Sequence, residues 1–141
     1  MSNKDIRWTQ RFQNFEKAFL RLKEALQIDE LNELERNGVI QRFEFTLELC
    51  WKTLKDYLEA EGFQFKPTPK ETIRQAYSSE LIADAQILID ALDIRNDLAH
   101  DYSGDKFEKS EGIIRTDVFP AIEEVYLFFL SKVNSNQTNL F

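Results

Sequence analysis

The sequence predicts an all-α protein, an antiparallel four-helix up-and-down bundle with an extra short helix. Apolar residues recur three and four positions apart along four long stretches, which is the spacing of amphipathic helices. The chain has only 4 glycines and 3 prolines in 141 residues, too few for the many turns of an all-β protein. A hydrophobic fraction of 43% with 12 phenylalanines argues against disorder. A single domain over residues 1–133 is therefore expected, followed by a flexible polar tail over residues 134–141.

The first two long helices are predicted from their apolar stripes. A helix over residues 5–27 carries a stripe spaced 4, 3, 4, 3 and 4, formed by Trp8, Phe12, Phe15, Phe19, Leu22 and Leu26. A second helix, over residues 34–60, carries Phe43, Leu47, Cys50, Leu54 and Tyr57. Gly62 is placed to cap its C-terminus. Because Cys50 lies on the apolar stripe, it is interpreted as a core residue and not as a nucleophile.

The remaining helices are predicted from caps and breaks. Thr68-Pro69-Lys70-Glu71 fits a capping box with proline at the first helical position, so a short helix should follow as far as Tyr77. A third long helix is expected from near Glu80 until Ser103-Gly104-Asp105 ends it, with a core face formed by Leu81, Ala85, Leu88 and Leu92.

The last helical region is predicted over residues 106–133. Pro120 removes a backbone donor, so we expect the helix to kink or restart there, and Asp117 is a candidate cap for the restart.

Composition excludes several classes of protein. A single cysteine and a single histidine rule out an intrachain disulfide and make a classical zinc site unlikely on ligand count alone. The sequence indicates no metal and no cofactor. The polar N-terminus does not resemble a signal peptide, and no run approaches the ~18 apolar residues of a membrane helix. A protein that does not enter the membrane, in a reducing cytoplasm, is expected.

Charge is unevenly distributed along an acidic chain. The net charge of −7 argues against a broad basic surface for nucleic acid. Residues 1–25 nevertheless carry six lysines and arginines against three acids, whereas residues 78–102 carry six acids against Arg95 alone. Any RNA bound at Arg95 would need positive charge from elsewhere, and the candidates are Arg7, Arg11, Lys106 and Lys109. Arg7 and Arg11 share a helix face, as an ordinary solvated pair or as part of a phosphate path.

The segment with the clearest chemistry is Ile94-Arg95-Asn96-Asp97-Leu98-Ala99-His100-Asp101-Tyr102. A histidine can give and take protons at neutral pH, and an arginine offers a planar fork of donors for a phosphate. Arg95 and His100 together suit metal-free RNA cleavage, with the histidine moving the proton of the ribose 2′-hydroxyl or of the leaving oxygen. Cations at a helix C-terminus also favour the helix dipole, so a purely structural role fits the same two residues.

Helix geometry separates the two side chains. Five residues turn a regular helix by about 500°, so Arg95 and His100 point about 140° apart, whereas Asn96 and His100 share a face. Convergence requires the helix to end or bend before His100, or two chains to share one site. The second arrangement also supplies two histidines, one for each proton transfer, and predicts a homodimer with facing motifs.

Arg95-Asn96-Asp97-Leu98-Ala99-His100-Asp101-Tyr102 resembles the Arg-x4-His-x-Tyr signature of HEPN-domain proteins. These are the toxin partners of minimal nucleotidyltransferases, and one branch is known as nucleotidyltransferase substrate-binding proteins. The resemblance extends to the block over residues 41–58, the segment over residues 69–76 and the run over residues 81–84, and so covers about residues 8–132.

The resemblance implies a dimeric helical bundle with metal-independent endoribonuclease activity. Arg95 and His100 would be catalytic, with Asn96 and Asp97 as supporting members of the motif. Tyr102 matches the position that partner nucleotidyltransferases modify with AMP, which blocks the RNase. AMP beside Arg95 would occupy the phosphate site and add negative charge there.

Three hypotheses follow. The chain is an RNase toxin neutralised by a cognate nucleotidyltransferase antitoxin, with transfer RNA or messenger RNA as substrate. Alternatively, it is a non-catalytic subunit that binds substrate or nucleotide for a two-component nucleotidyltransferase. The third hypothesis is a structural helical dimer with an inert motif. The motif is surrounded by three acids, Asp93, Asp97 and Asp101. They would weaken RNA binding if they face the cleft between the two motifs of the dimer. They could instead contact a basic surface of the partner protein, or pair with Arg7 and Arg11.

Overall fold

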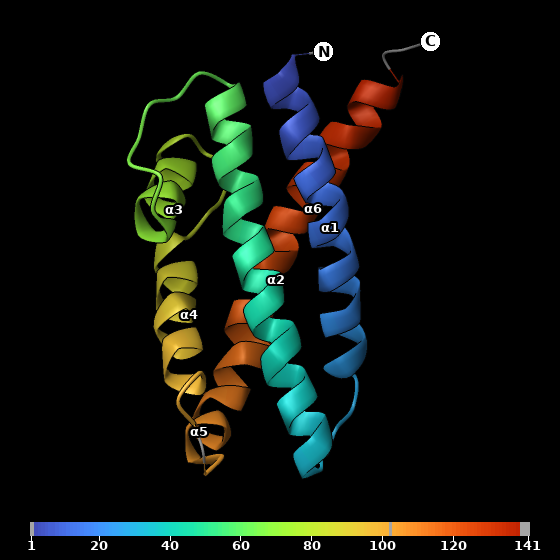
Figure 1. The fold of residues 1–141 in the computed structure, drawn as a ribbon, viewed down its shortest axis with the longest axis vertical. Helices are drawn as coiled ribbons and strands as arrows, with labels where there is room; N and C mark the ends of the chain where they lie inside the picture. Colours follow the sequence, from blue (N-terminus) through green and yellow to red (C-terminus); the bar gives the residue numbers. More distant parts are fainter. Residues whose placement is uncertain (1, 102, 139–141) are drawn as a thin grey trace.

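A computed structural model describes residues 2–101 and 103–138, and every regular element in these ranges is a helix. The elements are α1 (Asn3–Ala25), α2 (Glu33–Ala60), α3 (Pro69–Ser78), α4 (Ala85–Leu98), α5 (Asp105–Ile113), the π-helical turn η1 (Ile114–Val118) and α6 (Phe119–Thr138). Figure 1 shows α1, α2, α4 and α6 as long rods, with the short α3 beside α2. The predicted all-α bundle is confirmed. None of the described helices is long and apolar enough to cross a membrane.

The core is built mainly by aromatic rings of α1 that face α2 and α6. Phe15, Phe19 and Phe43 are almost completely buried, and the predicted stripes of the first two helices lie in this core. Phe19 stacks on Tyr126 of α6 with ring centroids 4.4 Å apart. Burying one such side chain contributes about 2–3 kcal/mol, so the aromatic stripe accounts for much of the packing energy of α1. Burial also raises the pKa of the Cys50 thiol, which agrees with its interpretation as a core residue.

The caps of α2 and α3 follow the sequence closely. Gly62 has φ +88°, and the amide of Phe63 donates to the Leu58 carbonyl at 3.1 Å, so the predicted glycine cap is confirmed. Thr68 accepts from the Glu71 amide at 3.4 Å at the start of α3. The capping box is only half formed, because the Thr68 amide donates to the Lys66 carbonyl at 2.8 Å.

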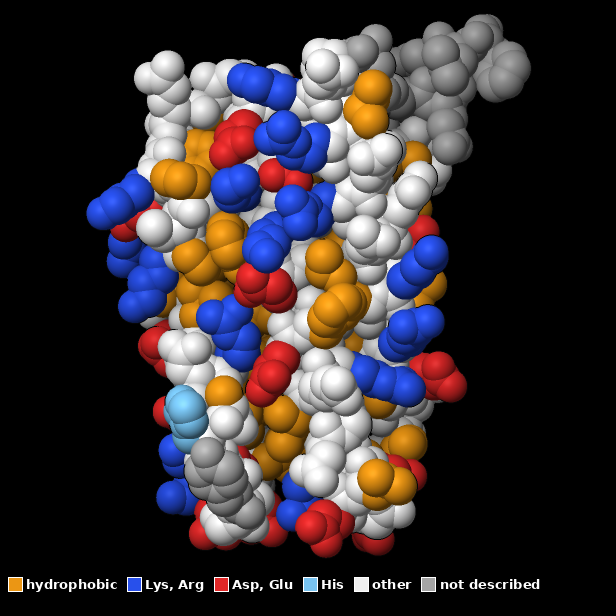
Figure 2. Space-filling view, in the orientation of Figure 1, with side chains coloured by type: hydrophobic (Ala, Val, Ile, Leu, Met, Phe, Trp, Pro, Cys, Tyr) orange, Lys and Arg blue, Asp and Glu red, His pale blue; other side chains and the backbone are white. Residues whose placement is uncertain are grey.

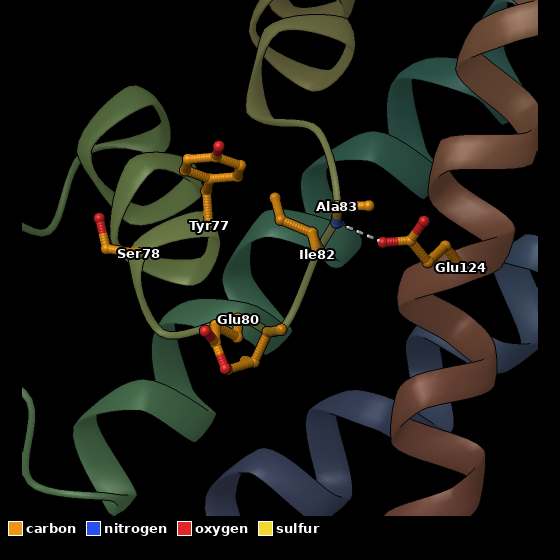
Figure 3. Close-up of a pocket in the computed structure, with 7 residues that line it drawn as sticks. Tyr77, Ser78, Glu80, Ile82, Ala83 and Glu124 are labelled. Carbon is orange, nitrogen blue, oxygen red and sulfur yellow. Dashed lines mark hydrogen bonds between the residues drawn. The ribbon is translucent and has the colours of Figure 1, made fainter.

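The third long helix starts later than the sequence predicts. The apolar pattern favours a helix from near Glu80, but α4 begins at Ala85, with Asp84 as its cap. The segment between α3 and α4 is not helical. Glu80 has φ +64°, and the Ala83 amide donates to Glu124 Oε1 on α6 at 2.8 Å (Figure 3). Residues of this segment, together with Tyr77 and Glu124, line an open hollow of about 630 Å³.

The irregularity expected at Pro120 occurs one turn earlier, as a π-helical turn. The Phe119 amide donates to the Ile114 carbonyl, five residues back, and α6 then begins at Phe119. Pro120, which lacks an amide hydrogen, therefore follows directly on a turn where the usual bonding of each amide four residues back is already interrupted. Asp117 lies inside η1, so its prediction as an N-cap is wrong. Helix α6 continues to Thr138, beyond the predicted end at residue 133, and residues 139–141 lie outside the described ranges.

Replacing Glu80 with glycine should stabilise the fold. A left-handed backbone costs a residue with a Cβ about 1–2 kcal/mol, and glycine avoids this cost while losing about 0.5–1 kcal/mol through its freer unfolded state. Glu80→Gly should raise the free energy of unfolding by about 0.5–1 kcal/mol in urea titrations. The control is Glu61→Gly at the end of α2, where φ is −80° and the change should destabilise instead. A loss of stability in Glu80→Gly would contradict the assignment of strain.

Candidate nucleic-acid site

The motif lies where α4 ends. Leu88 and Leu92 bury one face of α4, and the helix ends at Leu98. The amides of His100 and Asp101 then donate three residues back, to the carbonyls of Asp97 and Leu98, each at 3.2 Å. The helix therefore ends before His100, which is one of the two arrangements that the sequence left open. The His100 side chain is exposed beyond this end, seen as the pale blue group in Figure 2.

Arg95 is tied to the middle of α2. Its Nη1 donates to Glu48 Oε2 at 2.9 Å, and only 24% of its side chain is exposed. The same carboxylate oxygen accepts from Trp51 Nε1 at 3.0 Å, and Lys52 lies 3.0 Å from the other oxygen. Glu48 therefore fixes the direction of the Arg95 guanidinium.

The protonation of Glu48 reflects these contacts. Partial burial alone would raise the pKa of its carboxyl group, but the hydrogen bonds from Trp51 and Lys52 and the charges of Lys52 and Arg95 together hold that pKa below its ordinary value of 4.5. Glu48 is thus ionised at neutral pH. A phosphate that reaches Arg95 therefore meets a cluster of two cations and one carboxylate and not a bare cation.

A small hollow adjoins Arg95 and Asn96. It has a volume of about 280 Å³ and lies between the end of α4 and the start of α3, where it is also lined by Thr68, Lys70 and Asp93. The cations of Lys70 and Arg95 favour an anion there, whereas the carboxylate of Asp93 opposes one.

Asp101 has a structural role in the motif. Its Oδ1 accepts from the amides of Gly104 and Lys106 at 3.1 and 3.2 Å, and its Oδ2 accepts from the Phe107 amide at 2.8 Å. Burial raises the pKa of this carboxyl group, but the three amides and the Lys106 charge outweigh that effect, and the pKa is lowered overall. Asp101 thereby links the loop after His100 to the start of α5, and its carboxylate is directed toward amides of that helix.

The four cations considered for RNA contacts are not brought together. Lys106 and Lys109 are exposed on α5, which follows the motif directly in the chain. Arg7 and Arg11 lie toward the N-terminus of α1, at the opposite end of the bundle from α5 (Figure 1). Arg11 Nε donates to the buried carboxylate of Asp56 at 3.0 Å, so its partner is on α2 and not among the aspartates of the motif.

The functional roles of Arg95, His100, Asn96 and Asp97 stay predictions. Among the described residues, no hydrogen bond joins Arg95 to His100. Asn96 and Asp97 are exposed beside them. Tyr102 lies outside the described residues.

Sequence analysis missed Glu48. It lies next to buried Leu47 and Leu49 in the predicted second helix, and its contact with Arg95 spans 47 positions of the chain. The only local signal was a carboxylate one helical turn before Lys52, which alone predicts an ordinary surface pair.

The bundle and its motif define a HEPN-type protein, and the comparisons with known proteins agree. The chain belongs to the "Nucleotidyltransferase substrate binding protein like" family, whose profile matches residues 10–130. A crystal structure of a protein from Thermus thermophilus is similar at 33% sequence identity with a TM-score of 0.70, over 79% of this chain and 94% of that one. No functionally curated protein matches the chain.

Replacing Glu48 with glutamine should lower stability in a pH-dependent way. The side chain is 39% exposed, so solvent screening limits the loss in the free energy of unfolding at pH 7 to about 0.5–1 kcal/mol. Because the folded-state pKa lies below 4.5, the contribution of the carboxylate is complete above that value and is lost as pH falls through the folded-state pKa. Urea titrations at pH 7 and pH 3 should therefore show the wild-type advantage shrinking at pH 3.

The matched control is Glu71→Gln, which alters an exposed pair with Arg74 on α3. An equal loss in both variants, or a Glu48→Gln loss that grows toward low pH, would contradict the role given to Glu48.

Proposed function

We propose that the chain is a metal-independent endoribonuclease toxin that works as a homodimer and is neutralised by a partner nucleotidyltransferase. The observation that carries this proposal is the exposed His100, which follows the end of α4 five residues after Arg95 and makes no hydrogen bond through its side chain to the described residues. An exposed imidazole is accessible to a ribose hydroxyl, which the proposed chemistry requires. The resemblance of the motif to HEPN toxins, together with membership of the family, supports the same conclusion.

The chemistry needs two proton transfers. Neutral His100 takes the proton of the ribose 2′-hydroxyl, whose oxygen attacks the phosphorus and forms a 2′,3′-cyclic phosphate. The bond from phosphorus to the 5′-oxygen breaks, and this oxygen takes a proton from an imidazolium, supplied by His100 of the partner subunit. Arg95 donates to the phosphoryl oxygens, where negative charge develops.

Glu48 is compatible with this role of Arg95. A guanidinium carries five N–H donors, and the contact with Glu48 uses Nη1. The remaining donors can face a phosphate while Glu48 holds the plane of the group. Holding the group in one orientation lowers the entropy cost of binding the transition state.

Control by the partner follows from the same site. The nucleotidyltransferase would transfer AMP from ATP to the hydroxyl of Tyr102: an O–P bond forms at the tyrosine, the α–β phosphoanhydride bond breaks, pyrophosphate leaves, and the phenol proton goes to solvent. The AMP phosphate would then compete with RNA for Arg95.

A second candidate function is a non-catalytic subunit that binds nucleotide for a nucleotidyltransferase. The hollow of about 280 Å³ beside Arg95 favours it, because Lys70 and Arg95 could hold a phosphate there without any cleavage. The name of the family points in the same direction.

Purified, unmodified protein should cleave total RNA in excess EDTA, and His100→Ala should abolish cleavage. General acid–base catalysis by one group contributes about 10²–10⁴-fold, so the loss should be at least about a hundredfold. Arg95→Ala should lose activity similarly, whereas the control Arg74→Ala, at an exposed arginine on α3, should not. Intact-mass spectrometry of each sample excludes inhibition by attached AMP. Absence of cleavage by protein of unmodified mass would favour the nucleotide-binding subunit.

Heterodimers of one wild-type and one variant chain should test the shared cleft. Because the proposed reaction uses the His100 side chains of both protomers, a tandem-affinity-purified heterodimer of wild-type and His100→Ala chains should be at least about a hundredfold less active than the wild type, and half of the wild-type activity would contradict the shared site. A heterodimer of wild-type and Arg74→Ala chains is the control and should keep full activity. A strictly monomeric wild-type protein with full activity would exclude this arrangement.

A further inference from the structure

A groove between α1 and α2 exposes an aromatic ring. Phe45 of α2 is 63% exposed, whereas six other phenylalanines among the described residues are buried in the core. The ring borders a groove of about 610 Å³, lined also by the cations of Lys17, Arg21 and Arg42 and the amides of Asn14 and Gln41. We call this the Phe45 groove. The residues that line it come from α1 and α2, which lie side by side in Figure 1.

The groove is basic within an acidic protein. No carboxylate of the described residues lines it, although the chain carries 25 acids against 18 lysines and arginines. Within the part of the chain that the structure describes, Lys17, Arg21 and Arg42 form no ion pair with a carboxylate. Arg42 Nη1 donates to the Arg21 carbonyl at 2.8 Å, which holds its guanidinium against α1. Three uncompensated positive charges therefore border one exposed ring.

On α2, the Phe45 groove lies on the same face as Glu48, the residue that binds Arg95 of the motif. Gln41, Phe45, Glu48 and Lys52 are spaced 4, 3 and 4 residues apart on α2, which places them along one side of the helix. Phe45 is about one turn, or roughly 5 Å along the axis, from Glu48, which binds Arg95. A strand that crosses α2 from Arg95 would reach Phe45.

We propose that the Phe45 groove binds unpaired nucleotides of the RNA that the motif cuts, which rests on the proposed nuclease function. Phe45 stacks on a base, and Lys17, Arg21 and Arg42 contact the backbone phosphates. An exposed ring among unpaired cations is the composition of single-strand binding surfaces, because every base has a face that can stack. Paired bases in an RNA duplex do not present such a face, so the groove selects loops and single strands.

A second copy of the chain fits this groove less well. A two-fold axis through the groove would bring the same patch of both copies together, and three cations would face three identical cations. Like charges placed across an interface cost several kcal/mol. A strand of phosphates offers the opposite charge, and so it is the better occupant on electrostatic grounds.

The test is the binding of fluorescein-labelled oligouridine to the His100→Ala protein, which does not cleave its ligand. Phe45→Ala should weaken the binding of oligouridine about tenfold, whereas Phe45→Trp, which keeps an aromatic ring, should leave the affinity close to that of the parent protein. Arg42→Gln should reduce the slope of log Kd against log salt by about 0.7. The controls are Leu127→Ala and Lys132→Gln, an exposed apolar residue and an exposed cation on α6, which should change neither quantity.

Three results would overturn the proposal: no binding of oligouridine, unchanged affinity in Phe45→Ala, or equal affinity for an RNA duplex. A change in molar mass of Phe45→Ala by light scattering would also overturn it, because the groove would then be a subunit interface. Failure of the proposed nuclease is distinguishable, since binding that depends on Phe45 without any cleavage by the wild type would refute the nuclease and leave the groove intact.

Discussion

The packing of α1 against α2 through buried aromatic rings is the constraint on which the rest of the structure depends. Phe15 and Phe19 of α1 and Phe43 of α2 are almost completely buried, and Tyr126 of α6 stacks on Phe19. Because this core fixes the rotation of α2 about its axis, the opposite face must point outward. Phe45, two positions after Phe43, is exposed for that reason, and Glu48 is directed toward α4. The positions of the site and of the groove are both consequences of how the core is filled.

The same fold gives structural roles to several carboxylates, among them Asp101, one of the three motif aspartates expected to weaken RNA binding. Asp101 is directed toward three amides at the start of α5, Asp56 is buried against Arg11, and Glu48 is paired with Arg95. Each of these carboxylates stabilises a helix end or a helix–helix contact. The net charge of −7 is therefore a poor guide to the local charge of the surface, since no acid among the described residues lines the Phe45 groove.

Local patterns in the sequence predicted the bundle well, because the spacing of apolar residues in each amphipathic helix shows which of its faces is buried. The stripe that includes Trp8 and Phe12, the glycine cap at Gly62 and the threonine cap at Thr68 are all present. The late start of α4 could not be predicted, because Glu80 adopts a left-handed backbone conformation that glycine normally occupies. The contact between Glu48 and Arg95 was also missed, since it depends on how α2 and α4 are placed against each other and not on either helix alone.

The pairing of Arg95 with Glu48 has a consequence for how RNA would bind. Two unit charges about 4 Å apart interact by about 4 kcal/mol at an effective dielectric constant of about 20, so the repulsion of a phosphate by Glu48 offsets the attraction by one of its two cationic partners, Arg95 and Lys52. Because the pKa of Glu48 is lowered, this carboxylate stays charged at neutral pH. The motif can then orient a phosphate, but Arg95, Lys52 and Glu48 together offer it only one net positive charge. Further affinity would come from surfaces with uncompensated charge, and the groove one helical turn away on α2 has both that charge and a ring on which a base can stack.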